Sequence, residues 1–337
     1  MFSQKHCFLT FICSIVALLP ISVLLSRAEK RKKKTWPQPV IEPKGNPTSL
    51  AKVRLGKQLF FDSRLSGDNK MSCATCHRLE KGFGDGLEVG IGHRGRKLSR
   101  NTQTLLNVAY YPKLFWDGRA TTLEEQALMP IQSPDEMNQD LTQLEEELNA
   151  VTGYVRQFKT VFGTKVTRKG IAKALAAFQR SLVTGPSPYD RYVSGDRKAL
   201  SAEAKRGMEL FFGEAGCSEC HTAPTFSDGK FYRLGASFTD KGLESLTGKK
   251  KDRYRFRTPS LRNVADTAPY MHDGSLKTLG DVVTFYYRGV PKKTPEGLEM
   301  DLLPLTGNSF SEITDIVEFL RSLSGKVTKI TIPTLPK

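Results

Sequence analysis

Hydrophobic side chains recur at helical spacing along most of this chain, whereas the alternation typical of strands is rare and short. The spacing predicts helices over residues 169–182 and 311–323, each with one apolar face. Their apolar positions are Ile171, Leu175, Phe178 and Leu182, and Ile313, Ile316, Val317 and Leu320. A further helix is expected from Thr48 toward Phe61. The pattern therefore predicts a mainly α fold.

Proline and glycine divide the chain into parts. Residues 35–47 are rich in proline and predict an extended segment before the first helix. The sequence Gly185-Pro-Ser-Pro188 ends the helix before it, and polar residues continue to Asp196. At 337 residues the chain is long enough for two domains. We therefore expect an N-terminal domain over residues 35–195 and a C-terminal domain over residues 196–337.

The N-terminal segment has the composition of a targeting sequence. An apolar run over residues 8–25 ends at Ser26-Arg-Ala28, which has the small residues of a cleavage site. We expect residues 1–34 to be a signal peptide with a basic leader, and the protein to be exported to the periplasm. The alternative is a membrane anchor over residues 8–25 that is not cleaved. The basic cluster that follows the run argues against the anchor. Such clusters stay on the cytoplasmic side of a membrane, which would leave the rest of the chain in the cytoplasm instead of the periplasm.

Several segments occur twice, in the same order. The pattern G-x-x-L-F-F is followed by a segment of 12 residues that starts with N-V-A and ends with D-G, and then by Thr-Leu. The paired segments are 56–61 with 207–212, 107–118 with 263–274, and 122–123 with 278–279. In the first copy, Thr122 and Glu125 predict a capping box at a helix start. The chain therefore reads as one domain used twice.

Each copy also carries the pentapeptide C-x-x-C-H. The residues are Cys73, Cys76 and His77, and Cys217, Cys220 and His221. In c-type haem attachment the two thiols bond to the haem vinyl groups and the histidine ligates the iron. Zinc sites also use C-x-x-C pairs, but zinc gives no reason for the histidine after each pair. Disulfides within the pairs are the other alternative, because an exported protein would lie in an oxidising compartment. The pattern predicts two tandem cytochrome c-like domains, each with one covalently attached haem c.

The alignment of the two copies distinguishes the two irons. Pro130 in the first copy stands where the second copy has Tyr286. Tyrosine can ligate ferric iron and proline cannot, so the first iron is expected to keep an open position for peroxide. The alternative for Tyr286 is a packed side chain in an aromatic cluster. Rival ligands are Met271 and Met300 for the second iron, and Met129 and His93 for the first.

The charge balance is strongly basic. Lysine and arginine outnumber aspartate and glutamate by 51 to 35, and residues 1–34 supply +6 of the net charge of +16. The remaining +10 suits an acidic redox partner, although it equally serves solubility. No array of basic and aromatic residues indicates a nucleic-acid partner, so we expect none.

The motifs together resemble the bacterial di-haem cytochrome c peroxidases and their relatives, the MauG proteins, over roughly residues 46–325. They are both haem motifs, I-G-H-R-G at 91–95, R-N-T at 100–102, F-W-D-G-R-A at 115–120, L-E-E-Q-A at 123–127, E-M at 136–137, R-T-P-S-L-R-N-V at 257–264 and A-P-Y-M-H-D-G at 268–274.

The resemblance implies roles for residues of the first copy. Trp116 matches the tryptophan that carries electrons between the two haems. Gln126 and Glu136 match the distal side of the peroxidatic haem, where Glu136 is the acid/base that moves a proton between the peroxide oxygens. His93 matches the histidine that caps the peroxidatic iron in many of the peroxidases until the other haem is reduced.

The resemblance also implies one Ca²⁺ between the haems. Its ligands are Asn101 and the main-chain carbonyls of Thr267 and Pro269, which are oxygen ligands that suit a hard cation. Two departures from the peroxidase pattern stand out. Tyr286 replaces the usual methionine and matches MauG proteins, and Gln103 replaces a proline near the calcium site.

These residues predict a periplasmic di-haem peroxidase that reduces hydrogen peroxide to water. The expected electron donor is a small c-type cytochrome or a cupredoxin. One alternative is a MauG-like oxidase that modifies a partner protein, and another is a di-haem electron carrier without catalysis. The sequence leaves open whether the protein forms a homodimer.

Overall fold

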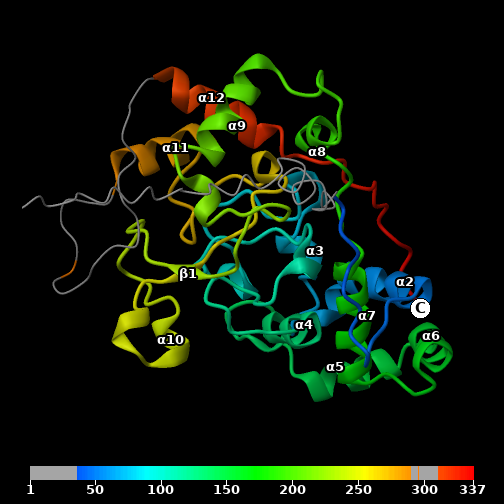
Figure 1. The fold of residues 1–337 in the computed structure, drawn as a ribbon. Coiled ribbons are helices and arrows are strands. Elements are labelled where there is room, and N and C mark those ends of the chain that lie inside the picture. The colour runs from blue at the N-terminus through cyan, green and yellow to red at the C-terminus, as the bar shows by residue number, and fades with distance from the viewer. Residues whose placement is uncertain (1–35, 290–294, 296–309) are drawn as a thin grey trace, which may run out of the picture. The chain divides into compact units, whose positions relative to one another are not determined.

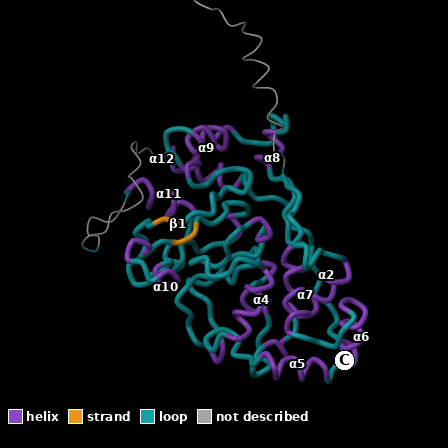
Figure 2. Tube along the Cα trace, turned by 60° about the horizontal axis from the view of Figure 1, so that its bottom comes forward, coloured by secondary structure: helices purple, strands orange, loops and turns teal. Residues whose placement is uncertain are grey.

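A computed structural model describes residues 36–289, 295 and 310–337 (Figure 1). The signal segment and Met300 lie outside these residues. Within them, helices are joined by long loops, and Figure 2 shows strand colour only at one short pair. No helix in this part of the chain is long and apolar enough to cross a membrane.

The predicted α class is confirmed by the order of elements. The first half contains α2 (Leu50–Phe60), α3 (Cys73–Cys76), α4 (Leu123–Gln132), α5 (Leu141–Asn149), α6 (Thr152–Phe162) and α7 (Arg168–Arg180). The second half contains α8 (Pro188–Val193), α9 (Ala202–Phe212), α10 (Glu244–Thr247), α11 (Leu279–Arg288) and α12 (Phe310–Arg321). Strands β1 (Phe231–Tyr232) and β2 (Phe256–Arg257) pair antiparallel, with Tyr232 opposite Phe256. The three helices predicted from periodicity are therefore confirmed within two residues at each end.

Each half has its own hydrophobic cluster around one close pair of helices. In the first half α2 packs on α7, and Gly56 is needed because an added Cβ would lie 1.9 Å from the Ala174 carbonyl oxygen. In the second half α9 packs on α12, and a Cβ on Gly207 would lie 1.8 Å from the Asp315 carbonyl oxygen. The two glycines of the repeated G-x-x-L-F-F pattern thus have the same packing role.

The backbone repeats in the segments after the haem motifs as well. Asn107 and Asn263 both adopt positive φ, of 61° and 57°, and each precedes a short 3-10 helix. Helices α4 and α11 both have 10 residues, with Pro130 and Tyr286 at the eighth position of each. The alignment of Pro130 with Tyr286 is therefore confirmed in space.

The capping box predicted for α4 is only half correct. The Thr122 hydroxyl accepts from the Glu125 N–H at 3.1 Å, as expected. The Glu125 carboxylate, however, accepts from the N–H of Thr121 at 2.9 Å. The glutamate thus satisfies the N–H of the residue before the cap rather than that of Thr122. At the start of α11 the shorter Asp281 closes a full capping box with Thr278.

The C-terminal segment after α12 runs back along the first half, as the red end of the ribbon in Figure 1 shows. The Gln58 side-chain amide donates to the Thr334 carbonyl at 3.1 Å, and the Gly153 N–H donates to the Lys337 carbonyl at 3.0 Å. Residues assigned by sequence to the C-terminal domain therefore also contact the N-terminal one.

Candidate active site

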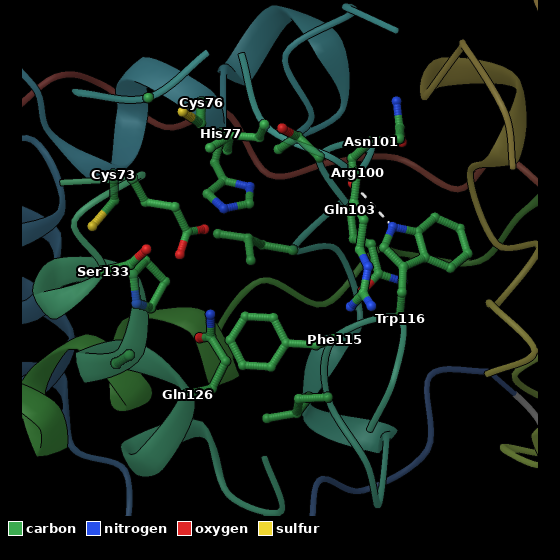
Figure 3. Close-up of a pocket in the computed structure, with 18 of the residues that line it drawn as sticks. Cys73, Cys76, His77, Arg100, Asn101, Gln103, Phe115, Trp116, Gln126 and Ser133 are labelled. Carbon is green, nitrogen blue, oxygen red and sulfur yellow. Dashed lines mark hydrogen bonds between the residues drawn. The ribbon is translucent and has the colours of Figure 1, made fainter. Parts of the chain in front are cut away.

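The first C-x-x-C-H motif forms one turn of helix, α3, followed by His77. The His77 N–H donates to the Cys73 carbonyl at 2.9 Å, which closes the turn and places both thiols beside the imidazole. Nδ1 of His77 donates to the Phe83 carbonyl at 2.9 Å, so Nε2 is left to ligate a metal (Figure 3). Burial lowers the pKa of His77, which favours the neutral imidazole that metal ligation requires.

The second motif has the same internal hydrogen bonds. The His221 N–H donates to the Cys217 carbonyl at 2.9 Å, and Nδ1 donates to the Phe226 carbonyl at 3.0 Å. Burial also lowers the pKa of His221. Cys73, Cys76, Cys217 and Cys220 are all free thiols, so the disulfide alternative is wrong in this structure. The described residues also form no cluster of three His, Cys, Asp or Glu side chains, so the four cysteines do not assemble a zinc site.

A cavity of about 700 Å³ opens beside His77 and both of its cysteines. This volume lies within the range of about 300–1,000 Å³ that is typical of sites for cofactors and small ligands. Its walls include Phe115 and Pro130, and two buried oxygens of lining residues, Gln126 Oε1 and Gln179 Oε1, have no hydrogen-bond partner. Two thiols, a ligating imidazole, an apolar cavity and an unpaired distal amide together fit a haem at this position.

The distal side of the cavity brings together the predicted polar residues Gln126 and Glu136 (Gln126 is seen in Figure 3). Burial raises the pKa of the Glu136 carboxyl, while the charge of Arg119 and a hydrogen bond from Ser133 oppose the rise. A carboxyl that holds its proton more readily than usual suits transfer of a proton in both directions. Its surroundings therefore match the acid/base role.

Pro130 itself offers no ligand to the first site. Its ring lines the cavity from α4, and proline supplies no donor atom from its side chain. The equivalent Tyr286 on α11 is close enough to Cys217 and Cys220 for their charges to act on its pKa. Burial is the main cause that raises the pKa of Tyr286, so a phenolate there would need a cation beside it. A ferric iron held by His221 would supply that charge.

Trp116 lies between the two copies, in contact with residues of both. Its indole N–H donates to the Asn101 carbonyl at 2.9 Å, drawn as the dashed line in Figure 3. The ring of His272 meets it edge-on, with the centroids 6.5 Å apart. On its other face His272 stacks on Phe256 at 3.7 Å and 15°. The positions aligned by the repeat, Trp116 and His272, are therefore neighbours in space.

The structure places His93 beside the cavity, with its ring turned elsewhere. Gly92 lines the cavity, while the His93 N–H donates to the Glu136 carbonyl at 2.7 Å. The buried ring lies with Nδ1 3.8 Å from an Asp68 carboxylate oxygen. The prediction that His93 caps the first iron would require this ring to turn into the cavity, and it stays a prediction.

The side-chain amide of Asn101, the residue predicted to ligate calcium, lies beside two main-chain carbonyls. Its side-chain nitrogen donates to the carbonyls of Leu87 at 2.9 Å and Glu88 at 3.3 Å. Carbonyl oxygens therefore surround this amide, as a hard cation would require after the amide turns over. The calcium site, with Asn101, Thr267 and Pro269 as its ligands, stays a prediction.

Sequence reasoning missed three contributors to the site. Arg119 stacks on Phe115, with the guanidinium carbon 3.6 Å from the ring centroid, and donates to Asp117. Arg100 joins the copies, because it donates to Asp117 at 2.6 Å and to Asp240 at 2.6 Å. Phe256 packs on His272. Arg119 and Asp117 both belong to the F-W-D-G-R-A motif, and this motif could have indicated from the sequence that Arg119 contributes to the site.

Comparison with known proteins agrees with this geometry. The family model described as "Di-haem cytochrome c peroxidase" matches residues 50–198. The chain is 42% identical over 305 residues to the methylamine utilization protein MauG of Methylorubrum extorquens, covering 89% of this chain and 86% of that protein. It is 41% identical over 321 residues to the cytochrome-c peroxidase IdrP1 of a Pseudomonas species, covering 85% and 84%.

A solved structure supports the same assignment. A crystal structure of a MauG-like protein associated with microbial copper homeostasis superposes with a TM-score of 0.79 and 32% identity. The match covers 86% of this chain and 95% of that one. The protein therefore belongs to the family of di-haem cytochrome c peroxidases and MauG proteins, which are di-haem oxidoreductases.

Proposed function

We propose that this protein is a periplasmic di-haem peroxidase that reduces hydrogen peroxide to water with electrons from an external one-electron donor. The observation that carries the proposal is the difference between two equivalent helix positions. Pro130 leaves the first site open, while Tyr286 stands at the second. The Gln126 and Glu136 pair described above also lines the first site.

Haem bound by Cys73, Cys76 and His77 would supply an iron that accepts peroxide and takes up its two oxidising equivalents. The chain's own residues would direct this chemistry. The Phe83 carbonyl orients His77 through Nδ1. Glu136 would take the proton from the inner peroxide oxygen and return it to the outer one, so that water leaves. The amide of Gln126, whose oxygen lacks a partner, would orient the peroxide.

The second site would deliver electrons to the first. We propose that Cys217, Cys220 and His221 hold the second haem, that Tyr286 ligates its iron, and that Trp116 conducts between them. Domains over residues 35–195 and 196–337, covalent attachment of both haems and one Ca²⁺ at Asn101 are parts of the same proposal. So is export by residues 1–34.

The test replaces the proposed acid/base. Glu136→Gln keeps the size of the side chain and removes its proton transfer, so peroxide turnover should fall by roughly 10²–10⁴-fold. Both haems should remain attached, as judged by haem stain and pyridine haemochrome. Glu146→Gln is the matched control, since this glutamate is exposed on α5 and does not line the cavity. Full turnover in the glutamine variant would refute the assigned role.

A MauG-like oxidase is the second candidate, and Tyr286 favours it. A phenolate ligand stabilises ferric iron and lowers the potential of the second haem, which makes reduction by an ordinary small cytochrome less favourable. Such an enzyme would hold its oxidising equivalents for minutes after peroxide is added and would oxidise a small cytochrome slowly. Rapid cytochrome oxidation in the same experiment favours the peroxidase.

A further inference from the structure

A basic lobe, defined here as residues 239–255, projects from the second half between β1 and β2 (yellow in Figure 1). Most of it has no counterpart in the first copy, because His221 to Asn263 spans 42 positions and His77 to Asn107 only 30, which is 12 fewer. The lobe contains four lysines and two arginines against three acidic residues. This extra segment is therefore also a concentration of positive charge.

The acidic side chains of the basic lobe are all engaged within the protein. Asp240 accepts from Arg100 at 2.6 Å, and Glu244 accepts from Arg253 at 2.5 Å. Asp252 accepts from the Thr247 hydroxyl at 2.7 Å. The lysines are Lys241, Lys249, Lys250 and Lys251, and all four are exposed. In the described part of the chain none of them forms an ion pair, so their charge faces solvent.

The basic lobe is held in shape from beneath. Arg233 is buried, with 5% of its surface exposed, and donates to the carbonyls of Arg253 at 3.0 Å and Lys251 at 2.8 Å. Arg255 donates to the same Lys251 carbonyl at 3.1 Å. Beside the lysines Leu246 is 53% exposed. The basic lobe therefore presents a fixed surface on which exposed positive charge stands beside one exposed apolar side chain.

The base of the basic lobe adjoins the route between the two sites. Its chain continues into Phe256, which stacks on His272, and His272 meets Trp116 edge-on. The Asp240–Arg100 pair ties the lobe to Asp117, the neighbour of Trp116. A protein bound on the lobe would thus lie over the aromatic contacts that lead to Trp116.

We propose that the basic lobe is the docking surface for an acidic redox protein that delivers electrons to this enzyme, an inference that rests on the proposed peroxidase function. Complementary charge would steer the two proteins together and raise the association rate, most strongly at low salt. A membrane surface suits the lobe less well. Helix α10 has only four residues and exposes one large apolar side chain, whereas membrane-surface helices present a long apolar face.

The test is a charge reversal in the basic lobe with a matched control. Lys249→Glu/Lys250→Glu/Lys251→Glu is compared with a second triple reversal of the same total charge at exposed lysines on and beside α6 and α7, far from α10 in both figures. The control positions are Lys159, Lys165 and Lys169. Reduced plastocyanin, an acidic blue-copper protein, is the probe, and its oxidation by the full di-haem protein with peroxide is followed by stopped flow.

We expect the lobe variant to lower the second-order rate by about tenfold or more at low salt, and the control variant to change it by less than about twofold. Carbodiimide cross-links between the probe's carboxylates and Lys249–Lys251 should appear in the wild type. Equal slowing by both variants, no dependence on salt, or the same response with basic mitochondrial cytochrome c would overturn the proposal. The proposal would also be overturned if the wild-type protein bound phosphatidylglycerol vesicles through the basic lobe and did not bind plastocyanin.

The spectral response to peroxide without the probe separates this inference from the proposed function. If all variants respond to peroxide as the wild type does while plastocyanin oxidation ignores the lobe, only the docking proposal fails. If even the wild type does not respond to peroxide, either as the diferric protein or after one-electron reduction of the second haem, the proposed function fails. Cross-linking still decides whether the basic lobe binds the probe.

Discussion

Gly56→Ala should destabilise the first half of the molecule although it adds a single methyl group. An added Cβ would lie 1.9 Å from the Ala174 carbonyl oxygen and 2.5 Å from its carbon. Contacts of Cβ atoms below 3.0 Å are essentially never seen, so α2 and α7 would have to separate by about 1 Å. The atoms in the way belong to the backbone, so no rotamer change relieves the clash.

The magnitude follows from two opposing effects of Gly56→Ala. Overpacking of a tight core costs up to about 3 kcal/mol when the backbone must move. Alanine gains about 1 kcal/mol over glycine in a helix interior. The free energy of unfolding should therefore fall by about 2 kcal/mol, which lowers the melting temperature of a domain of this size by roughly 4–8 °C.

The assay is thermal and urea unfolding of the purified protein with both haems attached, followed by far-UV circular dichroism. Gly45→Ala is the control, because nothing lies within 4 Å of a Cβ at that position. A Gly56→Ala protein as stable as the Gly45→Ala protein would refute the packing role of this glycine. It would also remove the physical reason for the repeated G-x-x-L-F-F pattern.

Three further predictions concern the second site, the core and the proton transfer. Tyr286→Phe removes the proposed phenolate ligand, so the reduction potential of the second haem should rise in a spectroelectrochemical titration; an unchanged potential would exclude ligation. Arg262→Met leaves Asp190 buried without its partner at 2.6 Å, and urea unfolding should show a loss of about 3–5 kcal/mol, whereas a loss below about 1 kcal/mol would contradict this. Because burial raises the pKa of Glu136, the carboxyl keeps its proton to a higher pH than usual. The rate with peroxide should therefore fall as pH is lowered through that raised pKa, and this acid limb should be missing in Glu136→Gln.

The repeat made much of the fold predictable from sequence. Patterns such as G-x-x-L-F-F reflect backbone contacts that only glycine permits, and Gly56 and Gly207 make the same contact in each half. The alignment of Pro130 with Tyr286 held because both follow a threonine cap by eight residues. Local features that occur in both copies can therefore be predicted from the sequence alone.

Contacts between the copies were less predictable. The Arg100–Asp240 pair and the stacking of Phe256 on His272 join residues far apart in sequence, with no shared motif to signal them. The direction of a side chain is also a tertiary property. His93 lies in a glycine-rich loop, and its N–H donates to the Glu136 carbonyl. Its ring lies near Asp68, and the spacing of residues along the sequence does not predict this direction.

The central claim is that the first site reacts with peroxide and the second does not. The most direct test is an optical and EPR spectrum of the diferric protein before and after one equivalent of hydrogen peroxide. The account predicts loss of the ferric signal of the haem held by His77, and recovery of it after two equivalents of a one-electron reductant. An unchanged spectrum in the diferric protein, and again after one-electron reduction of the second haem has released any His93 ligand, would contradict the account and favour an electron carrier.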